Sequence, residues 1–270
     1  MRMVVLVSVL MLGCRATVPV VESGPGLELV PTASAALARP AVGIWFEGEE
    51  LLVLEASGTR ILRFDSTLTA AETIPLTTRL VGPRGICSDR NYIYVYDSNT
   101  LFRMDKGNMV LSVWLNNLRV AGTASFAPTE MLVADADRGV IWYKGFFGES
   151  RQFVPSGTVR RPGAMAALGD VGYCVVSDGR ELVMLNRLGM VNRSLPLPAG
   201  TDLLAADGRG RVWVGRTGIA EVTGIAVGAG AGRWRQRYRL ADAASPTQLV
   251  AGSRLAVLDA GNRIFVYDLP

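Results

Sequence analysis

The sequence predicts an all-β fold, a six-bladed β-propeller with four-stranded blades. Apolar runs that end in a turn signal recur six times along the 270 residues, and successive ends lie 42, 38, 42, 38 and 44 residues apart. A mean step of about 41 residues is the period of a four-stranded propeller blade. Every repeat has its strands in the same order, and a surplus strand at the N-terminus matches one that is missing at the C-terminus.

The second strand of each repeat is the most regular element. It is an apolar run that ends at Glu55, Asp97, Asp135, Ser177, Gly215 or Asp259. A short first strand rich in small residues precedes it, at residues 43–46, 85–88, 122–126, 163–168, 203–206 and 248–251. A third strand follows a tight turn, at residues 60–64, 101–104, 140–143, 181–185, 219–222 and 263–267. A more polar fourth strand closes five repeats, at residues 72–76, 111–115, 151–155, 193–197 and 235–240.

The sixth repeat has no fourth strand before the sequence stops at Pro270. Residues 27–31 precede the first repeat and resemble the fourth strands, with a pattern like that of residues 152–155. We therefore expect residues 27–30 to be the outer strand of the sixth blade. A ring closed in this way has no open edge for strand pairing with another chain.

The N-terminal residues have the pattern of a targeting signal. A short cationic segment with Arg2 is followed by an apolar stretch over residues 4–12 and then by Gly13 and Cys14. This pattern resembles a bacterial lipoprotein signal, and the resemblance implies cleavage after residue 13 and a lipid on Cys14. The alternatives are an ordinary secretory segment and a transmembrane segment, but the stretch is too short for a hydrocarbon core that needs about 20 residues.

The same resemblance implies a domain order and an address. We expect a signal peptide at residues 1–13, a lipidated cysteine with a flexible tether at 14–26, and the propeller at 27–270. Arg15 follows the cysteine, where an Asp would signal inner-membrane retention in the proteobacterial sorting rule. We therefore expect a protein of the bacterial cell envelope, membrane-anchored through its lipid at the periplasmic face of the outer membrane.

The repeats carry a second resemblance. A first strand with glycine, a second strand ending in Val-x-Asp and a third strand starting with Arg-Ile, as at residues 257–264, resemble the NHL-type six-bladed propeller. The resemblance covers about residues 27–270. The sixth repeat matches best, and the fifth, with Gly215 in place of Asp, matches least. Such propellers include scaffolds, recognition modules and a few hydrolases and lyases, so the resemblance implies a fold more than an activity.

The composition excludes several kinds of catalytic site. The chain has no histidine, which rules out Ser-His-Asp and Cys-His nucleophiles, His-ligated zinc and imidazole proton shuttles. Its net charge of +4 is small, so we expect no nucleic-acid partner, and we expect no cofactor. Cys87 and Cys174 fall in different repeats, so we expect buried free thiols, with a disulfide between them as the alternative.

Two sets of charged residues are expected on one face of the ring. In a propeller the loops that lead into the first strands share a face with the turns after the second strands. The loops contain Arg39, Arg84, Arg119 and Arg161, and the turns contain Asp97, Asp135, Asp178 and Asp259. In one interpretation the aspartates accept backbone hydrogen bonds in their turns and the arginines pair with them between blades. In the other, the arginines form a cationic funnel at the channel mouth for a carboxylate or phosphate.

An outer strand carries a further basic pattern. After the glycine- and alanine-rich residues 228–232, every second residue is an arginine, at Arg233, Arg235, Arg237 and Arg239. Alternate residues of a strand share a face. These arginines either protect an edge strand from aggregation or form a stripe that contacts anionic lipid headgroups or a partner.

The function we favour is that of a monomeric, non-catalytic binding or scaffolding lipoprotein, which binds an envelope protein or an anionic ligand on the loop-bearing face. The alternative is a metal-dependent propeller hydrolase that resembles a lactonase. In that enzyme Glu55, Asn99 and the turn aspartates would hold a divalent ion. The carboxylates fall in hairpin turns rather than on strands that face the channel, which favours the binding function.

Overall fold

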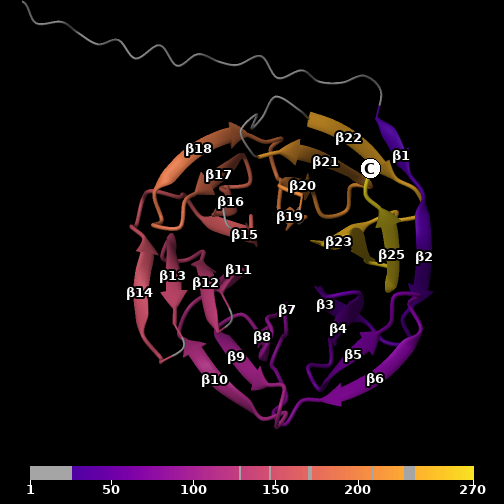
Figure 1. The fold of residues 1–270 in the computed structure, drawn as a ribbon, viewed down its shortest axis with the longest axis horizontal. Helices are drawn as coiled ribbons and strands as arrows, with labels where there is room; N and C mark the ends of the chain where they lie inside the picture. The colour runs from indigo at the N-terminus through magenta and orange to yellow at the C-terminus, as the bar shows by residue number, and fades with distance from the viewer. Residues whose placement is uncertain (1–25, 128, 146, 170–171, 208, 228–234) are drawn as a thin grey trace, which may run out of the picture.

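The chain folds as a ring of six sheets around a central channel (Figure 1). The structure, a computed structural model, describes residues 26–127, 129–145, 147–169, 172–207, 209–227 and 235–270. Each sheet is one blade, so the prediction of an all-β, six-bladed propeller is confirmed. No helix in these ranges is long and apolar enough to cross a membrane.

Blades one to three each contain four antiparallel strands in the predicted order. Blade one consists of β3 (Ala41–Glu47), β4 (Glu50–Glu55), β5 (Arg60–Phe64) and β6 (Ala70–Pro75). Blade two consists of β7 (Gly85–Ser88), β8 (Tyr92–Tyr96), β9 (Thr100–Asp105) and β10 (Leu111–Asn116). Blade three consists of β11 (Val120–Ala127), β12 (Glu130–Asp135), β13 (Val140–Lys144) and β14 (Ser150–Val154).

Blades four to six follow the same order, and two of them gain a strand from the N-terminus. Blade four consists of β15 (Pro162–Ala167), β16 (Tyr173–Ser177), β17 (Glu181–Leu185) and β18 (Val191–Pro196). Blade five consists of β19 (Leu203–Ala206), β20 (Arg211–Gly215), β21 (Glu221–Ala226), β22 (Arg235–Leu240) and β1 (Leu27–Leu29). Blade six consists of β23 (Pro246–Ala251), β24 (Arg254–Asp259), β25 (Arg263–Asp268) and β2 (Pro31–Ala36).

The third strand of blade five begins later than the expected residues 219–222. It starts at Glu221, because Ile219 N donates a hydrogen bond to Arg216 O at 3.0 Å and closes a turn before the strand.

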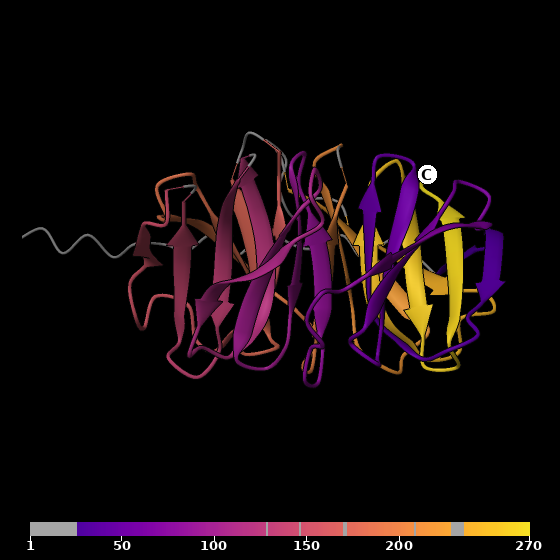
Figure 2. The same cartoon turned by 90° about the horizontal axis from the view of Figure 1, so that it is seen from below.

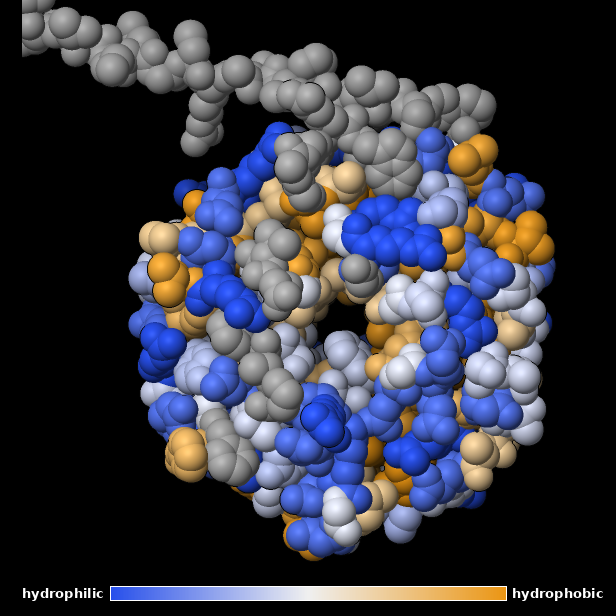
Figure 3. All heavy atoms as spheres, viewed as in Figure 1, coloured by the Kyte–Doolittle hydropathy of each residue, from blue (hydrophilic) through white to orange (hydrophobic). Residues whose placement is uncertain are grey.

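The alternating strand directions give the ring two distinct faces. Face A carries the loops that lead into the first strands and the turns between second and third strands. Face B carries the other two sets of connections; it is uppermost in Figure 2 and faces the viewer in Figures 1 and 3. The first strands surround the channel, which is visible as a hole at the centre of face B (Figure 3).

The N-terminal segment closes the ring, but residues 27–30 are not the outer strand of blade six. That strand is β2, which pairs with β25, whereas β1 pairs in parallel with β22 of blade five. β1 lies there because Leu29 buries its side chain against Tyr238 and Leu240, and Leu29 O accepts a hydrogen bond from Ala241 N at 2.9 Å. One continuous segment therefore joins the outer edges of two neighbouring blades.

The core consists of six apolar clusters, one at each boundary between neighbouring blades. Around the channel the first strands approach one another closely. A Cβ atom at Gly122 of β11 would lie 2.5 Å from Gly163 O of the next blade. Small residues in the first strands are therefore what allows the inner ring to close.

The two described cysteines are free and buried, as predicted. Burial raises the pKa of the Cys87 thiol and of the Cys174 thiol to about 12, so both stay protonated near neutral pH.

Candidate binding site at the channel mouth

The channel widens on face A into a hollow of about 770 Å³ that we call the mouth. Blades two, three, five and six supply its polar lining, which includes Arg84, Tyr96, Arg119, Asp202, Gln248 and Asp259. A narrower hollow of about 200 Å³ continues between the first strands, with Ile44, Met165 and Leu204 in its wall. The site can therefore receive a polar group at its rim above a narrower channel that is apolar in part.

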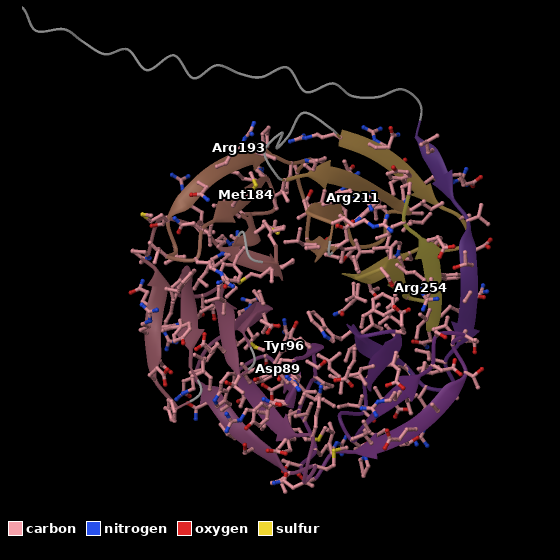
Figure 4. The ribbon with its side chains drawn as sticks, in the orientation of Figure 1. Asp89, Tyr96, Met184, Arg193, Arg211 and Arg254 are labelled. Carbon is pink, nitrogen blue, oxygen red and sulfur yellow. The ribbon has the colours of Figure 1, made fainter. Side chains whose placement is uncertain are left out.

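Gln248 and Tyr96 narrow the channel below the mouth. Gln248 Oε1 accepts a hydrogen bond from Ile44 N at 3.4 Å, and its Nε2 donates to Arg84 O at 3.2 Å. This side chain thus links blade six to blades one and two. Tyr96 lies beside the channel (Figure 4) and occupies the space above Gly85, where a Cβ would be 2.2 Å from the Tyr96 hydroxyl oxygen. Burial raises the pKa of Tyr96, which makes it a poor proton donor near neutral pH.

Two of the four predicted arginines lie at the mouth. Arg84 and Arg119 line it with exposed side chains. Arg39 and Arg161 are exposed as well, but they do not line this hollow. The recurrence of arginine before the first strands therefore predicts the correct face, and only half of the set reaches the channel.

The arginines that pair with aspartates do so within one blade. Arg119 Nη1 contacts Asp137 Oδ1 at 3.1 Å, and Arg161 Nη1 contacts Asp178 Oδ1 at 3.6 Å. The expected pairing between blades is not seen in these two cases, because the loop that leads into a blade lies beside the turn of that same blade on face A. All four side chains are well exposed, so each pair contributes only about 0–1 kcal/mol to the fold.

Asp97, Asp135 and Asp259 accept backbone hydrogen bonds, as the structural interpretation predicts for the turn aspartates. Asp97 Oδ1 accepts from two amides of its turn at 2.8 Å each. Asp259 accepts from Ser245 N at 2.6 Å and from Gly261 N at 2.7 Å, and so joins the loop before blade six to the turn of that blade. Asp135 makes the corresponding contacts to blade three amides at 3.3 Å.

Blade five makes the corresponding link between loop and turn, but here the carboxylate belongs to the loop and the amide to the turn. Gly215 occupies the position of Asp259, so the turn has no carboxylate there. Instead Asp202, in the loop before β19, accepts a hydrogen bond from Thr217 N at 2.7 Å. Thr217 follows Gly215 at the same spacing as Gly261 follows Asp259. The carboxylate of blade five is consequently exposed and lines the mouth.

The residues that the metal-dependent alternative would use do not form a cluster. Glu55 is buried in blade one, where its Oε2 accepts hydrogen bonds from Arg60 Nε at 2.7 Å and Ser57 Oγ at 3.3 Å. Asn99 lies in the turn of blade two. In the part of the chain that the structure describes, no group of three or more His, Cys, Asp or Glu side chains could hold a metal ion.

The arginines of β22 share one side of the strand, as predicted, and the residues between them are buried. Arg237 and Arg239 are exposed, and Arg235 Nη2 donates to Pro196 O of blade four at 2.9 Å. β22 is not an edge over its last three residues, because β1 pairs with it there. Arg233 lies outside the described residues, as do residues 1–25 with the predicted signal peptide and Cys14.

Three residues of the site were not singled out from the sequence. The residue types of Asp202, Gln248 and Tyr96 do not recur at the equivalent positions of the other repeats. The strand pattern gives no reason to single out Gln248 or Tyr96. For Asp202 a signal does exist. The loss of the turn aspartate at Gly215 predicts that another acceptor must satisfy the amides of that turn.

No protein-family model and no curated protein matches the sequence. Solved structures do match it. A streptogramin B lyase superposes with a TM-score of 0.64 at 12% identity over 88% of this chain and 86% of that chain. A virginiamycin B lyase from Staphylococcus aureus superposes with a TM-score of 0.61 at 12% identity, over 87% of each chain. A chain of a nidogen/laminin complex superposes with a TM-score of 0.60 at 16% identity over 74% of this chain and 85% of that chain. At such identities these likenesses show the propeller fold alone.

Proposed function

We propose that this chain is a non-catalytic binding module that holds an anionic group of a partner protein or ligand at the mouth on face A. The observation that carries the proposal is the pair of exposed guanidinium groups, Arg84 and Arg119, on a hollow of about 770 Å³. A guanidinium presents its donors in a planar fork that matches a carboxylate or a phosphate.

The chemistry of the lining favours binding over catalysis. A catalytically inactive form of the virginiamycin B lyase has alanine in place of a histidine, and this chain has no histidine. Asp259 is already bonded to two amides of its own blade, and the raised pKa of Tyr96 makes this residue a poor acid at neutral pH. The hydrolase alternative also has no metal-ligand set among the residues that the structure describes.

We further propose that the propeller is of the NHL type and is held at a bacterial membrane by a lipid on Cys14, at the periplasmic face of the outer membrane. The signal pattern of residues 1–13 and the repeat at residues 257–264 support this. A tether from Cys14 to Leu27 spans at most about 45 Å. Leu27 lies at the outer rim of the ring, away from the channel (Figure 1), so the mouth is clear of the tether's attachment point.

Photocrosslinking in intact cells tests the binding function. A photoreactive residue replaces Ala260, which is exposed and lines the mouth. We expect discrete crosslinked species that disappear when Arg84→Glu and Arg119→Glu are introduced together. Ala71, exposed on the outer strand of blade one, is the matched control position. The proposal is contradicted if position 260 yields no product, or if position 71 yields the same ones.

Fractionation tests the anchor separately. Cys14→Ser removes the proposed lipid site and should leave a folded propeller that no longer sediments with membranes. A variant that remains membrane-bound after a salt wash would show that something other than this lipid holds the protein.

A further inference from the structure

A groove on face A continues from the mouth outward between blades four and five. A hollow of about 400 Å³ borders the mouth and shares Asp202 with it. A smaller hollow of about 170 Å³ comes next and shares Thr201 with the middle one. Arg216 and Arg237 line this outer hollow. We call the succession of hollows, from the mouth to Arg237 on the outer strand β22, the four–five groove.

The groove includes Gly215, the position at which the fifth repeat lacks the turn aspartate. Gly163, Gly179 and Gly200 line its middle part, and Gly215 lines its outer part. Gly179 and Gly200 have φ values of +64° and +82°, a left-handed conformation that favours glycine. Because the glycines of the middle part have no side chain, the backbone of blades four and five forms part of the floor, together with Ala164, Val176 and Thr201. An extended chain can therefore come close to it.

The charges along the groove are arranged in a defined order. Arg84 and Arg119 stand at the inner end, and Arg216 and Arg237 stand at the outer end. The Arg216 side chain reaches across the loop before β19, where its Cδ is 3.8 Å from the Cβ position of Gly200. Between the two arginine pairs lies Asp202.

Two more carboxylates face the groove. Glu221 lines the outer hollow beside Arg216, and Asp259 lines the mouth. Asp259 is engaged by the amides of its own turn, and Asp202 is bonded to Thr217 N through one of its oxygens. The outer end thus has two guanidinium groups and one carboxylate. The inner end also has two guanidinium groups, of which Arg119 is paired with Asp137, and Asp202 lies between the two ends.

We infer that the four–five groove binds an extended segment of a partner protein that carries acidic side chains toward both of its ends. The inference rests on the proposed function and specifies its partner. The arginine pairs match carboxylates at the two ends, and the glycine floor leaves room for the backbone of the segment. An extended peptide also presents free N–H groups, and Asp202 is placed to accept one of them.

Fluorescence polarisation with a synthetic probe tests the inference. The probe is a labelled peptide of about nine residues that alternates Glu and Ala, and the control peptide alternates Lys and Ala. We expect the purified protein to bind the Glu peptide, less tightly as salt rises, and not the Lys peptide. Arg216→Glu and Arg237→Glu should each weaken binding about fivefold or more.

Arg239→Glu is the matched control. Arg239 is exposed on the same strand as Arg237 but does not line the groove, so its reversal should leave affinity within about twofold. If Arg84→Glu weakens binding while Arg216→Glu and Arg237→Glu do not, the groove is ruled out and the mouth remains a binding site. If the Glu peptide does not bind at all, the groove is also ruled out. Crosslinking at position 260 then decides the proposed function by itself.

Discussion

In blades five and six a carboxylate joins the turn after the second strand to the loop before the first strand. The carboxylate belongs to the turn in blade six and to the loop in blade five. In blade six the buried Asp259 of the turn accepts hydrogen bonds from the loop and from the turn. In blade five the turn has Gly215, and the exposed Asp202 of the loop accepts from the turn. These two blades therefore keep the same contact with different residues. The exchange exposes the carboxylate of blade five at the channel mouth, which Asp259 also lines, and leaves a glycine in the groove.

The two blades also share the N-terminal segment as their outer strand. β1 covers the end of β22, and β2 completes blade six next to β25. The largest effect on both blades should come from removing this segment.

We expect deletion of residues 26–36 to lower the free energy of unfolding by several kcal/mol, out of about 5–15 kcal/mol for a typical domain. The deletion exposes Tyr238 and Leu240 at the edge of blade five and removes β2 from β25, which becomes an open edge of blade six. Unfolding in urea, followed by tryptophan fluorescence, measures the change, and light scattering should detect aggregation through the exposed strand edges. Deletion of residues 15–25 is the control and should change neither quantity. A domain without residues 26–36 that is as stable and monomeric as the control would refute this role.

Asp259→Ala should have the next largest effect, a loss of about 2 kcal/mol of unfolding free energy. The substitution leaves Ser245 N and Gly261 N without their acceptor at a site where Asp259 is only 8% exposed. The same urea titration measures it. An unchanged midpoint would mean that water satisfies these amides and that the turn link does not stabilise blade six.

Asp202→Ala should cost less, about 1 kcal/mol or below, because Asp202 is exposed and water can replace it as the acceptor for Thr217 N. Adding Gly215→Asp to this variant recreates the arrangement of blade six. A Cβ at Gly215 would lie 3.3 Å from Glu221 O, so the turn must adjust by a few tenths of an ångström. We expect the double variant to regain part of the lost stability. A further loss would mean that the two arrangements are not interchangeable.

Arg161→Ala should have the smallest effect, about 0.5 kcal/mol or less, because the Arg161 side chain is 82% exposed and its partner Asp178 is 47% exposed. A melting temperature lowered by several degrees would instead assign this pair a structural role.

The strand pattern is readable from the sequence because each blade buries its second and third strands at a boundary with a neighbour. The strand that closes the ring is harder to predict, because residues 27–30 and the alanine-rich β2 are adjacent and both can pair with the edge of a blade. Only the burial of Leu29 against blade five distinguishes them.

The sequence predicts on which face of the ring the site lies, but it does not predict which residues form the site. Arginine recurs in the loops of face A, but its direction depends on each loop. Arg161 has a φ of +42°, pairs with Asp178 and does not line the mouth, whereas Arg119 pairs with Asp137 and does line it. Gln248 belongs to the site because its side chain reaches hydrogen-bond partners in other blades, and no local sequence pattern encodes that reach.

Hydrogen–deuterium exchange with and without the Glu–Ala peptide tests most directly whether blade five provides the binding site. We expect slower exchange at residues 198–203 and 216–221, on both sides of the Asp202 link, when the peptide is bound. We expect no change at residues 105–110 and 186–190, which are turns of face B. Protection confined to face B, or protection spread evenly around the six blades, would contradict a binding site at blade five.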